Sequence, residues 1–538
     1  MATKRILAVI DAETDPFLFG RVPNAFVWDI YDGDEHYTFE HISDALHFLS
    51  QARYLVYAHN GGKFDYLLPG FLDEINQFNK VMMINGRLAK FNIGASEFRD
   101  SYSILPIPLK DFDKLEIDYA KMEKSVRHLH MEEITQYLHR DTESLYKLVK
   151  AFRDEYGDGI TLAGSAMKFW QKQSKKKAPK STSSFYNRIA PFYHGGRVEA
   201  FHLGPIDGEF TMIDINSAYP FAMMHEHPIE PNDHKREYQD GEEIKGHWFY
   251  EVSCISQGAF AVHIKGKGLS FPADGERHSY STTGWELKTA IECGLIKGLK
   301  IDSVTEFTVT NNFKSYITYF YERKKRETNK NSPQYIFAKL FMNSLYGKFG
   351  ANPNNYSNYT LTEPRFVKAM EKDGYEFGGE LGPWAIMTSP LDESEERFYN
   401  VATAASITGF VRAILLKEMH RIRQEGGEVL YCDTDSIVYR GGKSRVYDKE
   451  LGGWSCDGVF TRGAIAGKKL YAFHGAKGWK TACKGVRISP EEIMRVANGE
   501  EVTYRRDAGS FKPDGSCSFV TRRVNRTDKV KQRGTGKP

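Results

Sequence analysis

The sequence predicts a multidomain protein of mixed class, with an α/β amino-terminal domain followed by a larger α+β region. The chain has 538 residues, which is enough for several domains. Residues 1 to about 170 alternate strand-like and helix-like segments, and this alternation is typical of an α/β layer domain. Hydrophobic residues make up 41% of the chain and aromatic residues 13%, so we expect large folded cores and little disorder.

Composition narrows the class of protein. The formal net charge of +3 is too small to indicate nucleic-acid binding by itself, so any positive groove must come from the placement of charges. Lys4 and Arg5 precede only a short apolar segment interrupted by Asp11, so no secretory signal is expected. No run is apolar enough to span a membrane. Six cysteines without a C-x-x-C pair argue against a zinc site or disulfide framework and fit a reducing cytoplasm.

Two strands are predicted near the amino terminus. Residues 6–14 form an apolar run that carries Asp11 and Glu13 on one face, because side chains alternate along a strand. Residues 55–60 form a second run, and the Gly-Gly pair after it predicts a turn that brings Asp65 near a strand end.

A long amphipathic helix is predicted over residues 131–156. Its flank carries Tyr137 and Asp141, which are four positions apart. Its apolar stripe consists of Ile134, Leu138, Leu145, Leu148 and Phe152. Residues 175–184 are basic and polar and contain proline, so they are either an interdomain linker or a solvated surface loop.

A third acidic strand begins the second region. Residues 209–214 read as a strand that ends in Asp214. Pro220 disfavours helical geometry at Tyr219, so we expect the chain to turn there.

Residues 338–350 predict a helix that stops near Gly350. Lys339, Asn343 and Tyr346 recur at helical spacing and therefore share one face. Alone, this pattern is also typical of an ordinary core helix with a solvated lysine.

Residues 431–439 contain the most informative pattern, a predicted β-hairpin with Asp433 and Asp435 at its tip. Two carboxylates on one side of a rigid hairpin repel each other unless a hard cation neutralises them, and Mg²⁺ is the usual occupant. An acidic turn without a metal is the alternative, because Asp is a favoured turn residue.

Taken in order, the segments DINSAYP, KLFMNSLYGKFG and YCDTDSIVY resemble motifs A, B and C of family B DNA polymerases. The variant NSLYGKF resembles the protein-primed branch found in bacteriophages and linear plasmids. The segments DAE, HNGGKFD and YLHRD resemble the Exo I, Exo II and Exo III motifs of 3′–5′ exonucleases, with one glycine more than usual in the second. This resemblance implies an RNase H-like exonuclease domain followed by a right-hand polymerase domain.

The resemblance also implies domain boundaries. The exonuclease domain is expected at 1–190 and the polymerase domain at 191–538. Within the polymerase domain we expect the palm at 191–225 and 399–470, an insertion at 226–310, the fingers at 311–350, a β-rich insertion at 351–398, and the thumb with a basic tail at 471–538.

The resemblance assigns roles at both active sites. Two Mg²⁺ ions, or Mn²⁺ in their place, are expected at each. In the polymerase domain the implied residues are Asp214, Asp435 and the Ile215 carbonyl as metal ligands, Asp433 as a tuning carboxylate, Lys339 on the triphosphate, Asn343 and Tyr346 beside the nascent base pair, and Tyr219 as the group that excludes a 2′-hydroxyl. In the exonuclease domain they are Asp11, Glu13, Asp65 and Asp141 as metal ligands, Tyr137 as the group that orients water, and Lys114 near the scissile phosphate.

Further residues are implied in DNA binding. The resemblance places Asn60, Phe64, Ser101 and Tyr102 on a frayed single strand, Tyr193, Gly195 and Gly196 (a YxGG segment) on the template, Arg412 on the primer or nucleotide side, and Lys469 and Tyr471 (a KxY segment) on the primer. From composition rather than from the resemblance, the basic linker is either a solvated loop or a tether that touches the DNA backbone, and the tail from Arg522 to Lys537 is expected to be flexible, with non-specific DNA contact as the second interpretation.

The expected function is DNA-directed DNA synthesis with 3′–5′ proofreading, by which a linear phage genome is copied through protein-primed strand displacement in the cytoplasm of an infected bacterium. The expected partners are primer–template DNA, dNTPs and a terminal (priming) protein, with no membrane, and the chain is expected to be a monomer. Three alternatives stay open: a nucleic-acid-primed family B polymerase, an exonuclease whose second half only binds DNA, and a non-catalytic single-strand-binding protein.

Overall fold

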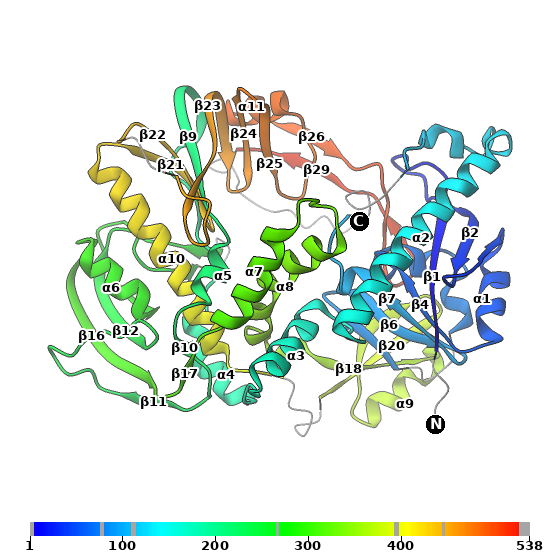
Figure 1. The fold of residues 1–538 in the computed structure, drawn as a ribbon, viewed down its shortest axis with the longest axis horizontal. Helices are drawn as coiled ribbons and strands as arrows, with labels where there is room; N and C mark the ends of the chain where they lie inside the picture. Colours follow the sequence, from blue (N-terminus) through cyan, green and yellow to red (C-terminus); the bar gives the residue numbers. More distant parts are fainter. Residues whose placement is uncertain are drawn as a thin grey trace.

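A computed structural model describes residues 5–75, 80–108, 115–264, 268–391, 398–443 and 447–526. Two large β-sheets organise this part of the chain, one on the right of Figure 1 and one at its upper centre. The helices α7 (Lys314–Arg326) and α8 (Pro333–Phe349) lie between them. The first sheet starts with the amino-terminal strands, and the second holds the strands that carry Asp214 and Asp433.

The first sheet has ten strands. In order across the sheet they are β19 (Glu376–Leu381), β20 (Trp384–Pro390), β18 (Ser357–Thr362), β5 (Lys80–Ile84), β6 (Arg87–Ile93), β7 (Ser96–Asp100), β4 (Tyr54–Ala58), β1 (Ile6–Thr14), β2 (Ala25–Tyr31) and β3 (His36–Phe39). Its centre is parallel and apolar because helices cover both faces. Val9 shares a buried cluster with residues of α2 (Met131–Tyr156), and Ile10 shares another with α1 (Ile42–Ser50).

The insertion expected at 351–398 extends this first sheet. The sequence predicted a protruding β-rich element, and the segment is β-rich, with α9 (Val367–Lys372) on one side. Its strand β18, however, pairs with β5 through Tyr359 opposite Val81 and Thr360 opposite Lys80. This pairing satisfies the backbone groups that β5 would otherwise expose at a sheet edge. Residues 392–397 lie outside the described part of the chain.

The second sheet has seven antiparallel strands. Their order is β25 (Gly478–Cys483), β24 (Leu470–Gly475), β23 (Trp454–Gly467), β9 (Gly204–Ile215), β22 (Ser436–Arg440), β21 (Glu428–Asp433) and β8 (Val198–Ala200). The helix α10 (Val401–Gln424) packs beneath β21 and β22, as the sequence predicted. The expected boundary at residue 470 falls where β24 joins this sheet.

A smaller antiparallel sheet occupies residues 233–307 at the left of Figure 1. Its strands are β11 (Asp233–Arg236), β16 (Ile296–Phe307), β12 (Phe249–Ser256) and β15 (Arg277–Thr283), and α6 (Gly284–Glu292) joins it to α10. Short pairs β10 (His227–Pro228) with β17 (Thr310–Asn311) and β13 (Val262–Ile264) with β14 (Gly268–Ser270) complete this region.

The amino-terminal domain and the helices α7 and α8 share one core. The rings of Phe152 on α2 and Phe337 on α8 lie 5.7 Å apart, and α3 (Leu162–Ser174) packs along α8. The basic segment at 175–184 joins them to α4 (Ser183–Ile189). Its Lys180 bridges to Tyr399, so this segment is anchored to the second region.

The carboxy-terminal region returns to the first sheet. It contains α11 (Pro490–Ala497), the pair β26 (Val502–Arg505) with β29 (Thr521–Val524), and the small hairpin β27 (Ser510–Phe511) with β28 (Cys517–Ser518). Phe511 is buried in the same cluster as the first sheet, and the Gly382 N–H donates to the Pro513 carbonyl at 2.6 Å. Residues 527–538 of the expected basic tail lie outside the described residues. Among the helices that the structure describes, each is too short or too polar to cross a membrane.

Candidate active sites

The first acidic site lies where three strands of the second sheet meet. Asp214 is near the end of β9, and Asp433 ends β21. Thr434 adopts a left-handed φ of 61°, which makes the tight turn that presents Asp435. The Asp435 carbonyl accepts a 2.9 Å hydrogen bond from the Ile215 N–H, so the hairpin tip is fixed beside the end of β9.

Burial and mutual repulsion shape the electrostatics of this site. Burial, followed by the charges of Asp435 and Asp457, raises the pKa of Asp214 to about 7. Burial also raises the pKa of Asp435 to about 6, with a further contribution from Asp433. Neighbouring carboxylates that are half-buried are costly without a cation. An all-oxygen donor set of this kind fits a hard divalent ion.

Sequence patterns did not identify Asp457. This residue lies on β23 at a bulge opposite Ile213 and Met212, and its side chain pairs with Lys480. Its charge acts on Asp214. No spacing rule within one segment could have linked it to the acidic hairpin, because the contact is between strands.

Asp433 and Lys469 form an ion pair in which both carboxylate oxygens lie 2.7 Å from the amino group. Lys469 was expected to bind a primer phosphate, and 38% of its side chain is exposed, so a phosphate could compete with Asp433. The ring of Tyr471 was expected to pack on the primer backbone. Instead it is buried, stacked on Phe473 at 4.4 Å and edge-on to Tyr431 at 5.3 Å.

The expected nucleotide residues form a platform beside this site. The rings of Tyr219 and Tyr346 stack with centroids 4.5 Å apart and 13° between planes. Lys339 and Asn343 are exposed on α8. Lys324 on α7 lies near Lys339, because the charge of Lys339, after burial, lowers the pKa of Lys324.

The prediction that the chain turns at Tyr219 is wrong. Tyr219 and Pro220 both lie inside the short helix α5 (Ala218–Ala222). Proline is tolerated in the first turn of a helix because its missing N–H has no partner there. The chain turns earlier, at Ser217, which has a φ of 55°.

The YxGG segment packs against the acidic hairpin. A Cβ on Gly196 would lie 2.7 Å from the Thr434 hydroxyl, so this glycine is required for packing on the hairpin. Arg412 was expected to contact DNA, but its side chain is 2% exposed. It donates to Glu286 and to the carbonyls of His194 and Gly195. Arg412 therefore supports the segment from inside.

The second acidic site lies between the first sheet and α2. Asp11 and Glu13 share one face of β1, and Asp141 lies on α2. Asp65 is buried, and its pKa is well above its ordinary value because of burial and the charge of Asp11. Burial, a hydrogen bond to Tyr119, and the charges of Asp141 and Glu13 raise the pKa of Tyr137. The structure thus gathers these expected residues despite the additional glycine before Asp65.

Two positions at this site differ from the sequence expectations. Tyr119 was not identified by any pattern, yet its hydroxyl lies 3.0 Å from that of Tyr137. Lys114 lies outside the described residues.

The residues expected to hold a single strand divide into two groups. Arg87 donates to Asn60 at 2.8 Å and lies 4.6 Å above the ring of Tyr102, so it joins two of them. Phe64 contacts Phe511 of the carboxy-terminal hairpin, with ring centroids 5.6 Å apart.

Ser101 does not fit the expected DNA contact. It is fully buried, and its hydroxyl donates to the Ala58 carbonyl at 3.2 Å. Its side chain therefore fixes the strand end that precedes the Exo II segment.

Comparison with known proteins identifies the family. The model for DNA polymerase type B, organellar and viral, matches residues 112–378. A DNA-directed DNA polymerase of Enterobacteria phage PRD1 is 35% identical over 97% of this chain and 98% of its own length. The DNA polymerase of Bacillus phage phi29 is 24% identical over 69% of this chain and 66% of its own length.

Solved structures show the same fold. The orthorhombic form of phi29 DNA polymerase is similar with a TM-score of 0.77 and 17% identity, covering 97% of this chain and 100% of that chain. The phi29 DNA polymerase complex with primer–template DNA and incoming nucleotides gives a TM-score of 0.75 at the same identity and coverage.

The fold is that of a DNA-directed DNA polymerase, a class of enzyme that uses divalent metal ions. The chain belongs to family B of these polymerases, with viral and organellar relatives. The predicted fold class, an exonuclease-type domain followed by a right-hand polymerase domain, is confirmed.

Proposed function

We propose that this polymerase extends DNA primers with Mg²⁺ at the palm site, removes mispaired ends at the site between β1 and α2, and starts synthesis from a terminal protein. The single observation that carries the proposal is the close approach of Asp214 and Asp435 at adjoining strand ends of a family B fold, where the Ile215 N–H donates to the Asp435 carbonyl and the charge of Asp435 acts on Asp214.

In the palm, the reaction is attack of the primer 3′-hydroxyl on the α-phosphate of a dNTP, which forms a new phosphodiester bond, breaks the bond between the α- and β-phosphates and releases pyrophosphate. Asp214, Asp435 and the Ile215 carbonyl would hold two divalent ions, which activate the attacking oxygen and stabilise the leaving one. Lys339 and Lys324 face the triphosphate side of α7 and α8 and offset its charge. The Tyr219–Tyr346 stack supports the sugar and the new base pair.

In the amino-terminal domain, the proposed reaction is hydrolysis of the last phosphodiester bond of a single strand. Asp11, Glu13, Asp65 and Asp141 would hold the metal ions that this hydrolysis requires. Tyr137 orients the attacking water, and Asn60 and Tyr102, joined through Arg87, hold the strand.

Protein priming is supported by the phage relatives and by two insertions. We assign the insertion at 226–310 to contact with a terminal protein and the insertion at 351–398 to enclosure of DNA. Contact between Gly382 and Pro513 supports the second assignment, because it links the insertion to the thumb. The enzyme is proposed to act as a monomer in an infected bacterial cell.

Separate substitution of the two sites tests the two activities. Asp435→Ala should lower dNTP incorporation by several orders of magnitude, because it removes a metal ligand, and leave single-strand degradation intact. Asp11→Ala combined with Glu13→Ala should do the reverse. Asp274→Asn, at an exposed position, is the control. Equal loss of both activities in either folded variant would contradict the assignment.

Priming needs its own experiment. The polymerase is incubated with labelled dATP, Mg²⁺ and a candidate terminal protein, and the expected product is a covalent protein–nucleotide adduct. Extension of a nucleic-acid primer without any adduct would favour the nucleic-acid-primed alternative.

A further inference from the structure

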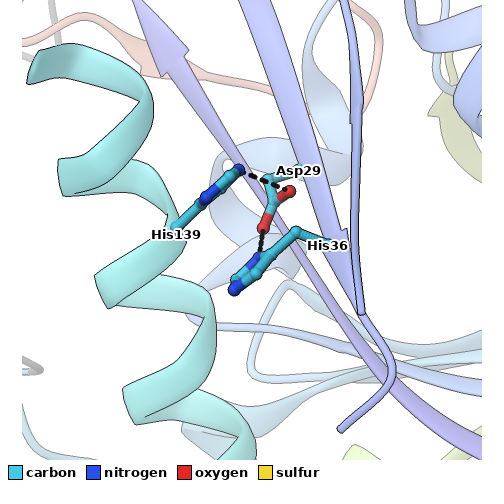
Figure 2. A group of neighbouring side chains, drawn as sticks. All are labelled: Asp29, His36 and His139. Atoms are coloured by element: carbon cyan, nitrogen blue, oxygen red, sulfur yellow. Dashed lines mark hydrogen bonds and ion pairs between the residues drawn. The ribbon is translucent and has the colours of Figure 1, made fainter. Parts of the chain in front are cut away.

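A buried carboxylate lies beside the proposed exonuclease site and is held by two histidines (Figure 2). Asp29 on β2 is fully buried. His36 Nδ1, from β3, lies 2.8 Å from one of its oxygens, and His139 Nε2, from α2, lies 3.4 Å from the other. The three side chains join a strand hairpin to a helix.

Two hydroxyl groups complete the partners of Asp29. Thr142 on α2 donates to it at 2.7 Å, and Thr38 on β3 donates at 3.2 Å. Full hydrogen bonding of this kind is what a buried carboxylate needs to be stable. We call Asp29, His36, Thr38, His139 and Thr142 the Asp29 clasp.

The position of the clasp connects it to the exonuclease site. Asp29 stands opposite Asp11 in the register of β1 and β2, and directly opposed residues share one face of the sheet. His139 and Thr142 flank Asp141 in the sequence of α2 and lie in the same turn region as Tyr137. The clasp therefore joins the turn that presents Tyr137 and Asp141 to the strand next to Asp11.

A metal ion is the other explanation for such a cluster, since two imidazoles and a carboxylate are a common donor set. The geometry of the two histidine rings argues against a metal ion. The rings of His36 and His139 are stacked at 3.9 Å with 14° between their planes. Because the nitrogen lone pair lies in the ring plane, one ion cannot lie in both planes of a parallel stack.

We propose that Asp29 is a positioning residue for the proposed exonuclease reaction, acting by fixing the α2 turn that carries Tyr137 and Asp141. This inference rests on the proposed exonuclease function. Apolar contacts hold α2 on either side of that turn: Ile134 lies in one buried cluster with Val27, and Leu145 lies in another with Val9. Loss of the clasp should therefore leave the helix docked but alter the placement of the reacting groups.

Thr142 offers a nearly isosteric test. Thr142→Val removes the hydroxyl that donates to Asp29, whereas Thr142→Ser keeps it. We expect Thr142→Val and Asp29→Asn to lower the rate constant for single-strand degradation about 10- to 100-fold, because small misplacements of reacting groups have effects of that size. The KM for the oligonucleotide should stay within about 2-fold, since Asn60 and Tyr102 are untouched.

Two further measurements distinguish a positioning role from a general loss of folding: the activity of the conservative variant Thr142→Ser, and the dNTP incorporation of every variant. Thr142→Ser should retain degradation within about 3-fold of the unmodified enzyme, and dNTP incorporation should be unchanged in every variant. Asp154→Asn breaks the exposed Lys150–Asp154 pair farther along α2 and should change neither activity.

The outcomes separate this inference from the function on which it rests. Undiminished degradation in Thr142→Val and Asp29→Asn, or equal loss of both activities, would overturn the inference alone. Failure of the unmodified enzyme to degrade a single strand above the level of the Asp11→Ala, Glu13→Ala variant would refute the exonuclease and the inference together. Stoichiometric binding of Zn²⁺ that disappears in His139→Gln would show a metal site and overturn the clasp.

Discussion

At the scale of single residues, the half-buried carboxylates of Asp214 and Asp435 link proton binding to metal binding. Burial raises both pKa values above the ordinary range for aspartate, to about 7 and about 6. In the metal-free folded protein the pair therefore binds protons more tightly than in the unfolded chain. Its contribution to stability is fully present below about pH 4 and is lost as the pH rises through about 7.

This linkage predicts competition between protons and metal. The Mg²⁺ concentration for half-maximal dNTP incorporation should rise about tenfold as the pH falls from about 7 to about 6, since Asp214 must lose its proton to bind the ion. The measurement is a set of Mg²⁺ titrations between pH 6 and pH 8.5 at constant ionic strength. A pH-independent midpoint would show that Asp214 does not titrate in this range.

Tyr219 gives a second prediction at this scale. Its ring is fixed by the stack on Tyr346, so a smaller side chain leaves room for a 2′-hydroxyl. Tyr219→Val should reduce discrimination against ribonucleotides about 10- to 100-fold, or about 1.4–2.7 kcal/mol. Tyr219→Phe keeps the ring and is the matched control. The ratio of rNTP to dNTP incorporation efficiency decides the matter, and an equal ratio in all three proteins would remove Tyr219 from this role.

At the scale of elements, the buried pair Arg412–Glu286 holds α10 to α6. Both side chains are 2% exposed. Glu286→Gln should lower the free energy of unfolding by about 3–5 kcal/mol, because it leaves a buried guanidinium unpaired. Glu292→Gln breaks the exposed pair with Lys417 between the same two helices and should have an effect of about 0–1 kcal/mol.

Urea denaturation followed by tryptophan fluorescence measures both variants. Equal midpoints for Glu286→Gln and Glu292→Gln would contradict a stabilising role for the buried pair. Arg412 also donates to the carbonyls of His194 and Gly195 in the YxGG segment. If Glu286→Gln lost polymerase activity at temperatures where the variant is folded, the Arg412–Glu286 pair would also be needed to position that segment.

Elements with strong local patterns were predictable from the sequence. The helix expected at 131–156 is α2, with the same bounds, and the strand expected at 6–14 is β1. The helix expected at 338–350 begins five residues earlier, at Pro333, because Ser332 caps it. Periodicity and capping are local, so they are visible in one segment.

Contacts between distant segments were not predictable in the same way. The burial of Arg412 depends on Glu286 and the engagement of Lys469 on Asp433, and both partners are remote in the sequence. A lone arginine or lysine in a motif is compatible with a surface or an interior position. The Asp29 clasp has the same character, because its members come from two strands and a helix.

At the scale of the whole molecule, the insertion at 351–398 connects the first sheet to the carboxy-terminal region. Its β18 continues the first sheet, its Leu361 and Leu381 enter the core of that sheet, and its Gly382 bonds to the carboxy-terminal region at Pro513. Phe511 of the carboxy-terminal region is buried in the same core. The thumb is thereby connected to the amino-terminal domain through a contact outside the palm, as an enclosure of DNA requires.

Two variants should weaken this connection and with it strand displacement. Replacing residues 357–390 with a short Gly/Ser loop removes the insertion, and Phe511→Ala loosens the thumb while keeping the insertion. Both should add single nucleotides on an open template within about 3-fold of the unmodified enzyme and lose at least about tenfold in extension through a downstream duplex, because the palm is intact but the DNA is no longer enclosed. Phe377→Ala, on β19 and 49% exposed, is the control within the same insertion.

Extension is measured on both templates with a trap that limits each enzyme to one binding event. Because the replacement exposes core residues, Phe511→Ala is the decisive variant, and undiminished displacement by this folded protein would show that the thumb contact does not enclose the DNA.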